Sequence, residues 1–184
     1  SRENNDDKST WDNYQSYASI ISRELNADLR CISMSGIGVM VSWCPLIMPQ
    51  VYDRINPNRE FPKNDFTQWK PDIVVVNLLQ NDDWLINRLS PIPDTEERIK
   101  HYANFIQSIR NQYQFATIFC TLGNMNITRE KSPWPAVVQA AVDSLDDPKL
   151  FFTTMPYKNT GGHPTVSEHR QMADILTPFI KSKI

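Results

Sequence analysis

A histidine near the C-terminus is the residue in this chain best suited to acid–base chemistry. His163 follows Gly161 and Gly162 and precedes Pro164. The glycines give this loop backbone freedom, and the proline fixes the backbone where a final helix should begin. A histidine presented in this way can act as a general base. For an isolated His-Pro pair, however, a histidine in an ordinary surface turn is the commoner outcome.

Two other positions carry groups that could bind an oxyanion. Asn81 offers a side-chain N–H, and Gly36 offers a backbone N–H with no Cβ beside it. Together with a base and a nucleophile, such donors make up a hydrolase that attacks a carbonyl carbon. Taken singly, Gly36 could be a turn glycine, and Asn81 could form an Asx turn at a strand end. Whether Gly36 and Asn81 bind an oxyanion or only form turns depends on whether the fold brings them together with His163.

Helical and strand-like segments alternate along the chain. Apolar residues at helical spacing, with capping residues or prolines at their starts, predict helices at about residues 13–25, 94–113, 135–145 and 164–184. Short apolar runs predict buried strands at residues 29–34, 71–79, 115–121 and 150–154. Prolines between residues 44 and 65 predict an irregular excursion with one helical turn, and the polar residues 80–84 are expected to form a loop.

This alternation predicts an α/β protein, a three-layer α/β/α sandwich with a central parallel sheet. The run at residues 71–79 is apolar on both faces, which is typical of a central strand. In such a sheet the loops at the carboxyl ends of the strands converge on one edge. Gly36, Asn81, Asn124 and His163 each follow a predicted strand, so the fold should gather them into one site.

Length, charge and cysteine content exclude several classes of function. The 184 residues suit a single domain, and a formal net charge of −2 without a basic stripe argues against a nucleic-acid partner. The apolar runs are far shorter than the roughly 20 residues that span a bilayer, so no membrane partner is expected. Three scattered cysteines predict neither a disulfide framework nor a metal site. No glycine-rich phosphate loop follows a strand, which disfavours a nucleotide binder.

Four sequence blocks carry a resemblance to a known superfamily. They are Ser-Gly-Ile-Gly at residues 35–38, Asn-Leu-Leu-Gln-Asn-Asp at 77–82, Cys-Thr-Leu-Gly-Asn-Met at 120–125, and His-Pro-Thr-Val-Ser-Glu-His at 163–169. In this order they resemble the SGNH (GDSL-like) hydrolases. Within that superfamily the chain is most similar to the acetyl esterases of carbohydrate esterase family two. The resemblance extends from about Tyr14 to the C-terminus.

The resemblance implies a role for each of three residues. His163 corresponds to the catalytic histidine, and Gly36 and Asn81 correspond to the donors of the oxyanion hole. The implied activity is hydrolysis of an acyl ester, such as an acetyl group on a carbohydrate, without a metal or an organic cofactor. Export from the cell is also implied. Asp82 is expected to support the loop, and His169 to pack or hydrogen bond within the fold.

Aromatic and apolar side chains near the same edge could shape specificity. Trp43, Trp84 and Trp134 are expected in loops, where flat rings suit the faces of sugars. They could equally be ordinary loop anchors. Met125 and Trp134 could line an acyl pocket.

The chain departs from the superfamily pattern at its nucleophile. It contains no Gly-Asp-Ser block, so the catalytic serine is expected either upstream of this chain or at Ser1. A sheet without its first strand would leave an unpaired edge, so a complementing N-terminal segment is expected.

Two further departures affect the site itself. Thr160 stands where many members have an aspartate, which implies a Ser–His dyad oriented by carbonyl oxygens. Leu79 replaces a glycine and could press on Asn81. These departures keep open a second hypothesis, a catalytically inactive SGNH-fold module for carbohydrate binding or assembly.

Overall fold

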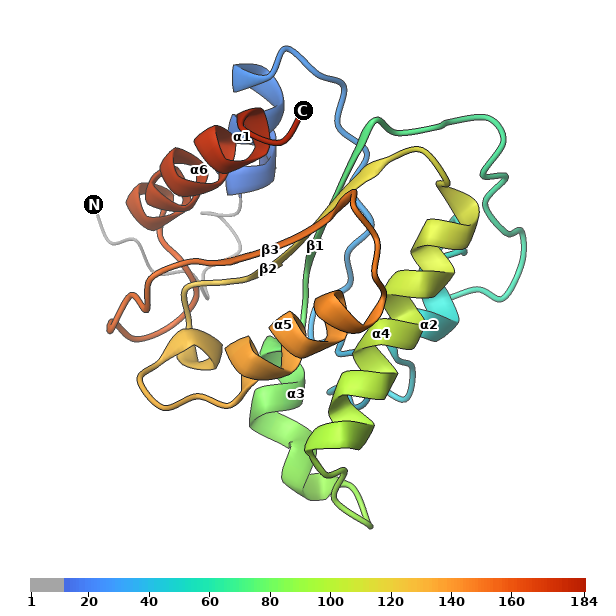
Figure 1. Cartoon of the computed structure of the whole chain (residues 1–184), viewed down its shortest axis with the longest axis vertical. Coiled ribbons are helices and arrows are strands. Elements are labelled where there is room, and N and C mark those ends of the chain that lie inside the picture. The colour runs from blue at the N-terminus through green and yellow to red at the C-terminus, as the bar shows by residue number, and fades with distance from the viewer. Residues whose placement is uncertain (1–11) are drawn as a thin grey trace.

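Three parallel strands form the centre of the protein. The computed structural model describes residues 12–184. Strands β1 (Ile73–Asn77), β2 (Thr117–Leu122) and β3 (Leu150–Thr154) lie side by side in that order (Figure 1). Both strand pairs are parallel, and the register places Val75 opposite Phe119 and Phe119 opposite Phe151. The carboxyl ends of the three strands therefore lie at one edge of the sheet.

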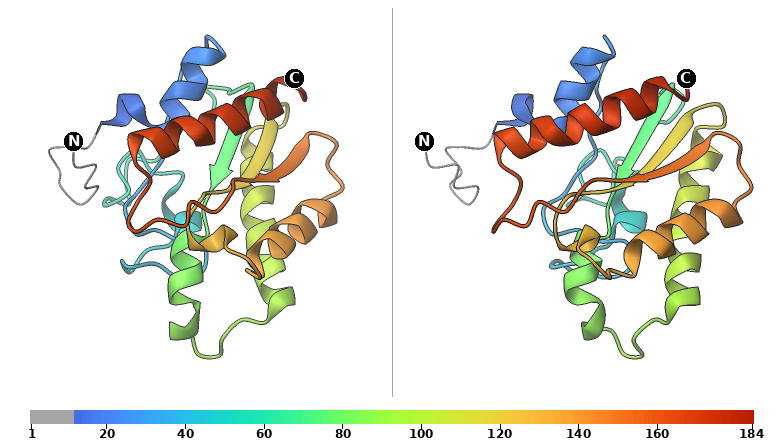
Figure 2. Two further views of the ribbon diagram at one scale, coloured as in Figure 1. Left: turned by 90° about the vertical axis from the view of Figure 1, so that its left-hand side faces the viewer. Right: turned by 60° about the vertical axis from the view of Figure 1, so that its left-hand side comes forward.

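Helices cover both faces of this sheet. Helices α1 (Tyr17–Glu24) and α6 (Val166–Lys181) pack together on one face, and α4 (Thr95–Gln112) and α5 (Trp134–Ser144) pack on the other (Figures 1 and 2). Shorter elements complete the described chain: α2 (Met48–Val51), α3 (Gln80–Leu85) and the 3₁₀ turns Asn13–Gln15, Ile86–Arg88 and Asn126–Thr128. The arrangement confirms the predicted three-layer α/β/α class.

Local sequence signals set the starts of the long helices. Asp94 caps α4, where its Oδ1 accepts the Glu97 N–H at 2.8 Å and the Glu97 side chain accepts the Asp94 N–H at 2.9 Å. Thr165 and Glu168 form the same reciprocal pair at the start of α6. These caps satisfy N–H groups that have no partner within the helix.

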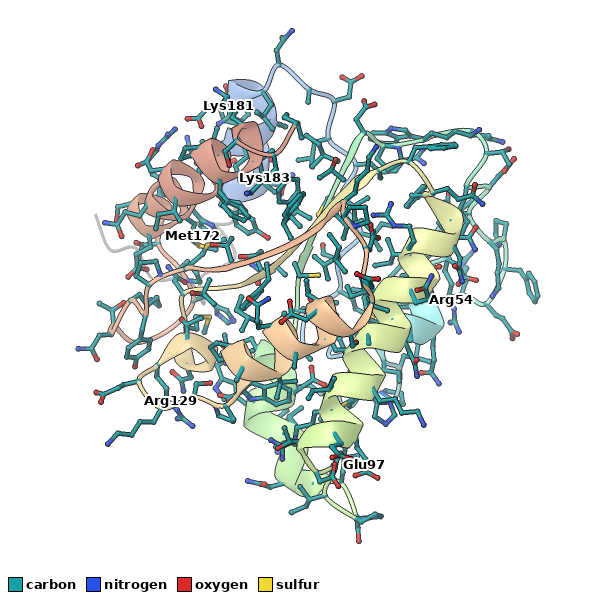
Figure 3. The ribbon with its side chains drawn as sticks, viewed as in Figure 1. Arg54, Glu97, Arg129, Met172, Lys181 and Lys183 are labelled. Carbon is teal, nitrogen blue, oxygen red and sulfur yellow. The ribbon has the colours of Figure 1, made fainter. Side chains whose placement is uncertain are left out.

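Two hydrophobic clusters hold the layers together, one on each face of the sheet (Figure 3). On the α4 and α5 face, Tyr102, Ile106, Ile118 and Trp134 are all at most 1% exposed. On the α1 and α6 face, Phe119 of β2 packs against apolar side chains of both helices. Burial of this kind is the main favourable contribution to folding.

The predicted strand at residues 29–34 is wrong. The structure shows a segment without regular secondary structure there, and most of its side chains are exposed. Within residues 12–184, β2 is the one strand that pairs with β1. The predicted central strand β1 is therefore an edge strand, and Ile73, Val74 and Val75 are only half buried. An apolar run becomes a buried strand only when a neighbouring strand accepts its backbone hydrogen bonds.

Residues 80–84, expected to be a loop, are also different, because they form most of helix α3. The predicted excursion at residues 44–65 is confirmed, with α2 as its helical turn. None of the helices between residues 12 and 184 has the length and apolar character that crossing a membrane would require.

Candidate active site

Gly36 lies in a turn that favours glycine. Its φ is +77°, and a Cβ built on it would lie 3.0 Å from the Cβ of Trp43. The Trp43 N–H donates to the Gly36 carbonyl oxygen at 2.9 Å and closes the turn. Among the described residues no acceptor pairs with the Gly36 N–H, so the structure leaves this donor open to a ligand.

A buried carboxylate fixes the backbone of this loop. Asp82 is 0% exposed, and its side chain accepts the N–H groups of Val39 at 2.9 Å, Met40 at 2.7 Å and Val41 at 3.2 Å. Burial raises the pKa of Asp82, and these backbone hydrogen bonds oppose the rise. A Cβ on Gly38 would lie 2.5 Å from Oδ2 of Asp82, so the close approach requires glycine. Asp82 therefore supports the loop.

Asn81 lies in the first turn of α3, next to the same loop. Its Nδ2 donates to the Ile37 carbonyl oxygen at 2.7 Å, which uses one of its two amide hydrogens. Leu79, immediately before α3, has a φ of +76°, and its side chain is fully buried in the core. The backbone conformation at Leu79 is one that favours glycine.

His163 lies on the loop between β3 and α6 and is exposed. The Lys158 backbone N–H anchors the start of this loop, because it donates to the Asn124 carbonyl oxygen at 2.7 Å. The Lys158 ammonium donates to the His163 carbonyl oxygen at 3.3 Å. The loop is thus tied to the segment that follows β2.

Hydrogen bonds join all these loops along the carboxyl edge of the sheet. The Gly36 loop bonds to α3 through Asn81. Gln80 of α3 accepts the Ile127 N–H at 3.2 Å, which connects α3 to the loop after β2. That loop bonds in turn to the loop of His163. The structure thus links the segments that carry the three expected catalytic residues.

The three tryptophans differ in exposure. Trp43 is 56% exposed beside the Gly36 turn, with the Arg88 guanidinium 4.6 Å from its ring centroid, and Trp84 is 40% exposed on α3. Trp134, expected in a loop, is instead the first residue of α5 and 1% exposed. Its indole N–H donates to Asp83 at 3.0 Å. Trp134 therefore anchors α5 and offers no exposed ring to a sugar.

Unpaired polar atoms lie near Met125, which is partly buried in the loop after β2. Asn124 is 4% exposed, and its Oδ1 has no hydrogen-bond partner among the described residues. The same holds for Nε2 of Gln80. Buried polar groups are normally paired, so these two atoms are exceptions at the carboxyl edge of the sheet.

His169 belongs to the packing between α1 and α6. Its ring stacks on Tyr17 with centroids 6.0 Å apart, and its Nδ1 accepts the Tyr17 N–H at 3.3 Å. Burial lowers the pKa of His169, which favours the neutral ring. Its contacts are those of a packing and hydrogen-bonding residue.

Glu168 was not expected to contribute to the site, although the Thr-x-x-Glu pattern of a capping box was visible in the sequence. Its Oε1 accepts the Thr160 hydroxyl at 2.6 Å, and its Oε2 accepts the Thr165 N–H at 2.8 Å and the Lys158 ammonium at 3.0 Å. Burial opposes the ionisation of Glu168, but these hydrogen bonds and the Lys158 charge outweigh it and lower the pKa to about 2.

The low pKa of Glu168 predicts a pH-dependent stability. Because the folded-state pKa is about 2, below the ordinary 4.5, the ionised group stabilises the fold above about pH 4.5, and this contribution is lost as the pH falls toward 2. Glu168→Gln should therefore lower the free energy of unfolding by a constant amount from pH 5 to 7 and by less below pH 4.5. Denaturant unfolding at a series of pH values measures this. The exposed Glu130→Gln is the control, and a difference that stays constant from pH 5 to 3 would contradict the prediction.

Between residues 12 and 184, no three His, Cys, Asp or Glu side chains are grouped as a metal site would require. Ser1, one of the two expected locations for the nucleophile, lies outside the described residues. The site as described thus contains a histidine and two donors.

Curated relatives match nearly the whole chain, although no protein-family model does. Cellulase/esterase CelE of Acetivibrio thermocellus is 31% identical over 182 residues, which cover 93% of this chain and 22% of that protein. The acetylxylan esterase/glucomannan deacetylase of Cellvibrio japonicus is 25% identical over 187 residues, 96% of this chain and 51% of that protein. The chain thus spans about half, or less, of the length of these relatives.

A solved structure shows the same fold. A family two carbohydrate esterase from Clostridium thermocellum, in complex with cellohexaose, matches with a TM-score of 0.80 and 32% identity, over 92% of this chain and 54% of that one. This similarity confirms the expected fold and the resemblance to family two carbohydrate esterases.

Proposed function

We propose that this chain, similar over nearly its whole length to family two carbohydrate esterases, forms most of a single catalytic domain that hydrolyses acyl esters of carbohydrates. The observation that carries the proposal is the hydrogen-bonded edge on which the segments of Gly36, Asn81 and His163 are joined. Named activities of the relatives favour an acetyl ester as the substrate.

The mechanism assigns one step to each group. His163 accepts the proton of a serine hydroxyl as the serine oxygen bonds to the ester carbonyl carbon. The Gly36 N–H and the second amide hydrogen of Asn81 donate to the resulting oxyanion. Collapse of this intermediate breaks the bond to the sugar oxygen, which takes the proton from His163. Water then cleaves the acyl-enzyme by the same steps and releases the acid.

The nucleophilic serine is proposed to lie on a complementing N-terminal segment that adds a strand to the free edge of β1. Ile73 to Val75 are half buried at this edge, and residues 29–34 pair with no strand among the described residues. A hollow of about 200 Å³ lies beside the latter segment, lined in part by Cys31 and Arg54, and Nε of Arg54 is buried without a partner. An added strand would supply the missing backbone partners.

Labelling of the active serine tests this assignment directly. The protein that carries this chain with its upstream residues should hydrolyse an aryl acetate and release acetate from acetylated xylan. A fluorophosphonate should label one serine stoichiometrically, and peptide mapping should place the label in the segment that precedes Ser1. A label on Ser1 would select the other expected location. Absence of both turnover and labelling would contradict the esterase proposal.

A non-catalytic carbohydrate-binding module is the second candidate. It is favoured by Thr160 at the position where the superfamily has an acid, and a structural relative is seen in complex with cellohexaose. Calorimetry with cello- and xylo-oligosaccharides distinguishes the two candidates. Sugar binding by a protein that cleaves no ester would select the binding module.

Exposed Trp43 and Trp84 are expected to bind the sugar part of the substrate. Trp43→Ala should raise KM for an acetylated oligosaccharide roughly 3- to 10-fold, because an aromatic contact contributes about 1 kcal/mol. Its KM for a small aryl acetate should change little. Phe115→Ala serves as the control, since this 83% exposed ring precedes β2, at the opposite edge of the sheet. An equal rise in KM for both substrates would show that Trp43 supports the structure of the site and does not contact the sugar.

A further inference from the structure

A buried lysine lies beneath the loop that carries His163. The side chain of Lys158 is 3% exposed. Its ammonium lies 3.0 Å from Oε2 of Glu168 and 2.8 Å from the Thr160 hydroxyl. It also lies 3.3 Å from the carbonyl oxygens of both Gly161 and His163. Four acceptors therefore surround the three hydrogens of one ammonium group.

Glu168 connects this group to helix α6. One carboxylate oxygen accepts the Thr160 hydroxyl, and the other accepts the Thr165 N–H at the helix start. Both oxygens are thus bonded to the loop or its junction with α6. The carboxylate and the ammonium form a compact ion pair whose other partners all belong to residues 160–165.

Glu168 stabilises the fold through this ion pair, but the placement of the pair also indicates a second role. Removing a lysine and a carboxylate from water costs about as much as their attraction returns, and apolar replacements are often as stable. The loop, however, contains two glycines, whose backbone can adopt many conformations. Asn159 and Gly162 both have positive φ, and Gly161 has open space around its Cβ position. Multiple bonds to one fixed cation select a single conformation of such a loop.

We infer that Lys158 is a positioning residue for His163, acting through the His163 carbonyl oxygen and the Thr160 hydroxyl. The inference rests on the proposed role of His163 as the base. In this arrangement the negative charge lies on Glu168. The Glu168 carboxylate holds the Lys158 ammonium and the Thr160 hydroxyl in place, and Lys158 in turn bonds to the backbone of the loop. Thr160 thus takes part in the support of the histidine although it is not an acid.

Kinetics of the protein with its upstream residues test the inference. Lys158→Met should lower kcat for an aryl acetate about 10- to 100-fold, because displacement of a catalytic group by about 1 Å has effects of this size. KM should stay within about twofold. Lys158→Arg, which keeps the charge, should recover part of the loss. Lys181→Met, an exposed lysine in the last turn of α6, is the matched control (Figure 3).

A spectroscopic measurement separates this inference from the proposed function. In the same protein, the His163 imidazole signals in ¹H–¹³C spectra should be single and sharp, and they should broaden or split in Lys158→Met. Thr160→Val, at an exposed position, provides a milder variant if Lys158→Met fails to fold. Unchanged imidazole signals and unchanged kcat in a folded variant would overturn the inference. Broadened imidazole signals in a protein that cleaves no ester would show that Lys158 orders the loop of His163, and would reject the esterase proposal together with the catalytic part of the inference.

Discussion

Replacing His163 by alanine is expected to lower kcat for ester hydrolysis at least about 1,000-fold in the protein with its upstream residues. Without the imidazole, the serine proton has no acceptor and the leaving alcohol has no donor. The fold should survive, because His163 is exposed on a loop outside the core. Steady-state turnover of an aryl acetate and a thermal melt measure the two effects.

Two other histidines provide controls for this experiment. His101 is exposed on α4, and His101→Ala should leave both activity and melting temperature unchanged. His169 packs against Tyr17, so His169→Ala should lower the melting temperature more than it lowers kcat. Near-normal turnover by His163→Ala would reject its role as the base.

The helix-covered parallel sheet could be predicted because each of its elements carries its own local signal. Strands β1 and β3 lie within the predicted apolar runs, β2 ends one residue beyond its run at Leu122, and Asp94 caps α4 as its position suggested. These signals act over a few residues and do not depend on the rest of the chain. The edge location of Asn81 and His163 followed from the parallel topology alone.

The wrong predictions concern properties that distant residues decide. Residues 29–34 have the composition of a buried strand, but no strand between residues 12 and 184 pairs with them. Trp134 was expected near the surface, but the layer of α4 and α5 buries it. The link from Lys158 to Glu168 spans ten residues and a helix start, so its geometry could be seen only in the folded loop.

Leu79 and Asp82 also depend on residues that are distant in the sequence. A leucine with positive φ has no local signal, and its burial in the core holds it in that conformation. The expected support role of Asp82 was an inference from its block, whereas its three backbone partners come from a loop about 40 residues earlier in the sequence. Contacts between residues so far apart in the sequence determine both the geometry of the site and the stability of the fold.

Asp82→Ala is therefore expected to lower the free energy of unfolding by about 3 kcal/mol or more. It would leave the N–H groups of Val39, Met40 and Val41 without their acceptor in a buried or partly buried place. Asp82→Asn keeps one acceptor oxygen, so it should lower the free energy of unfolding by less. Denaturant unfolding at pH 7 measures the free energy of unfolding of the wild type and of the two variants.

The exposed Asp143 is the matched control, because among the described residues its side chain bonds only to Gln139, one turn earlier in α5. Its replacement by alanine should change the free energy of unfolding by no more than about 0.5 kcal/mol. The proposed ester hydrolysis adds a second expectation, that Asp82→Asn lowers kcat for an aryl acetate, because the loop that Asp82 holds carries Gly36. If Asp82→Ala unfolds like the wild type, the loop has other support, and Asp82 is not what keeps the Gly36 N–H in place.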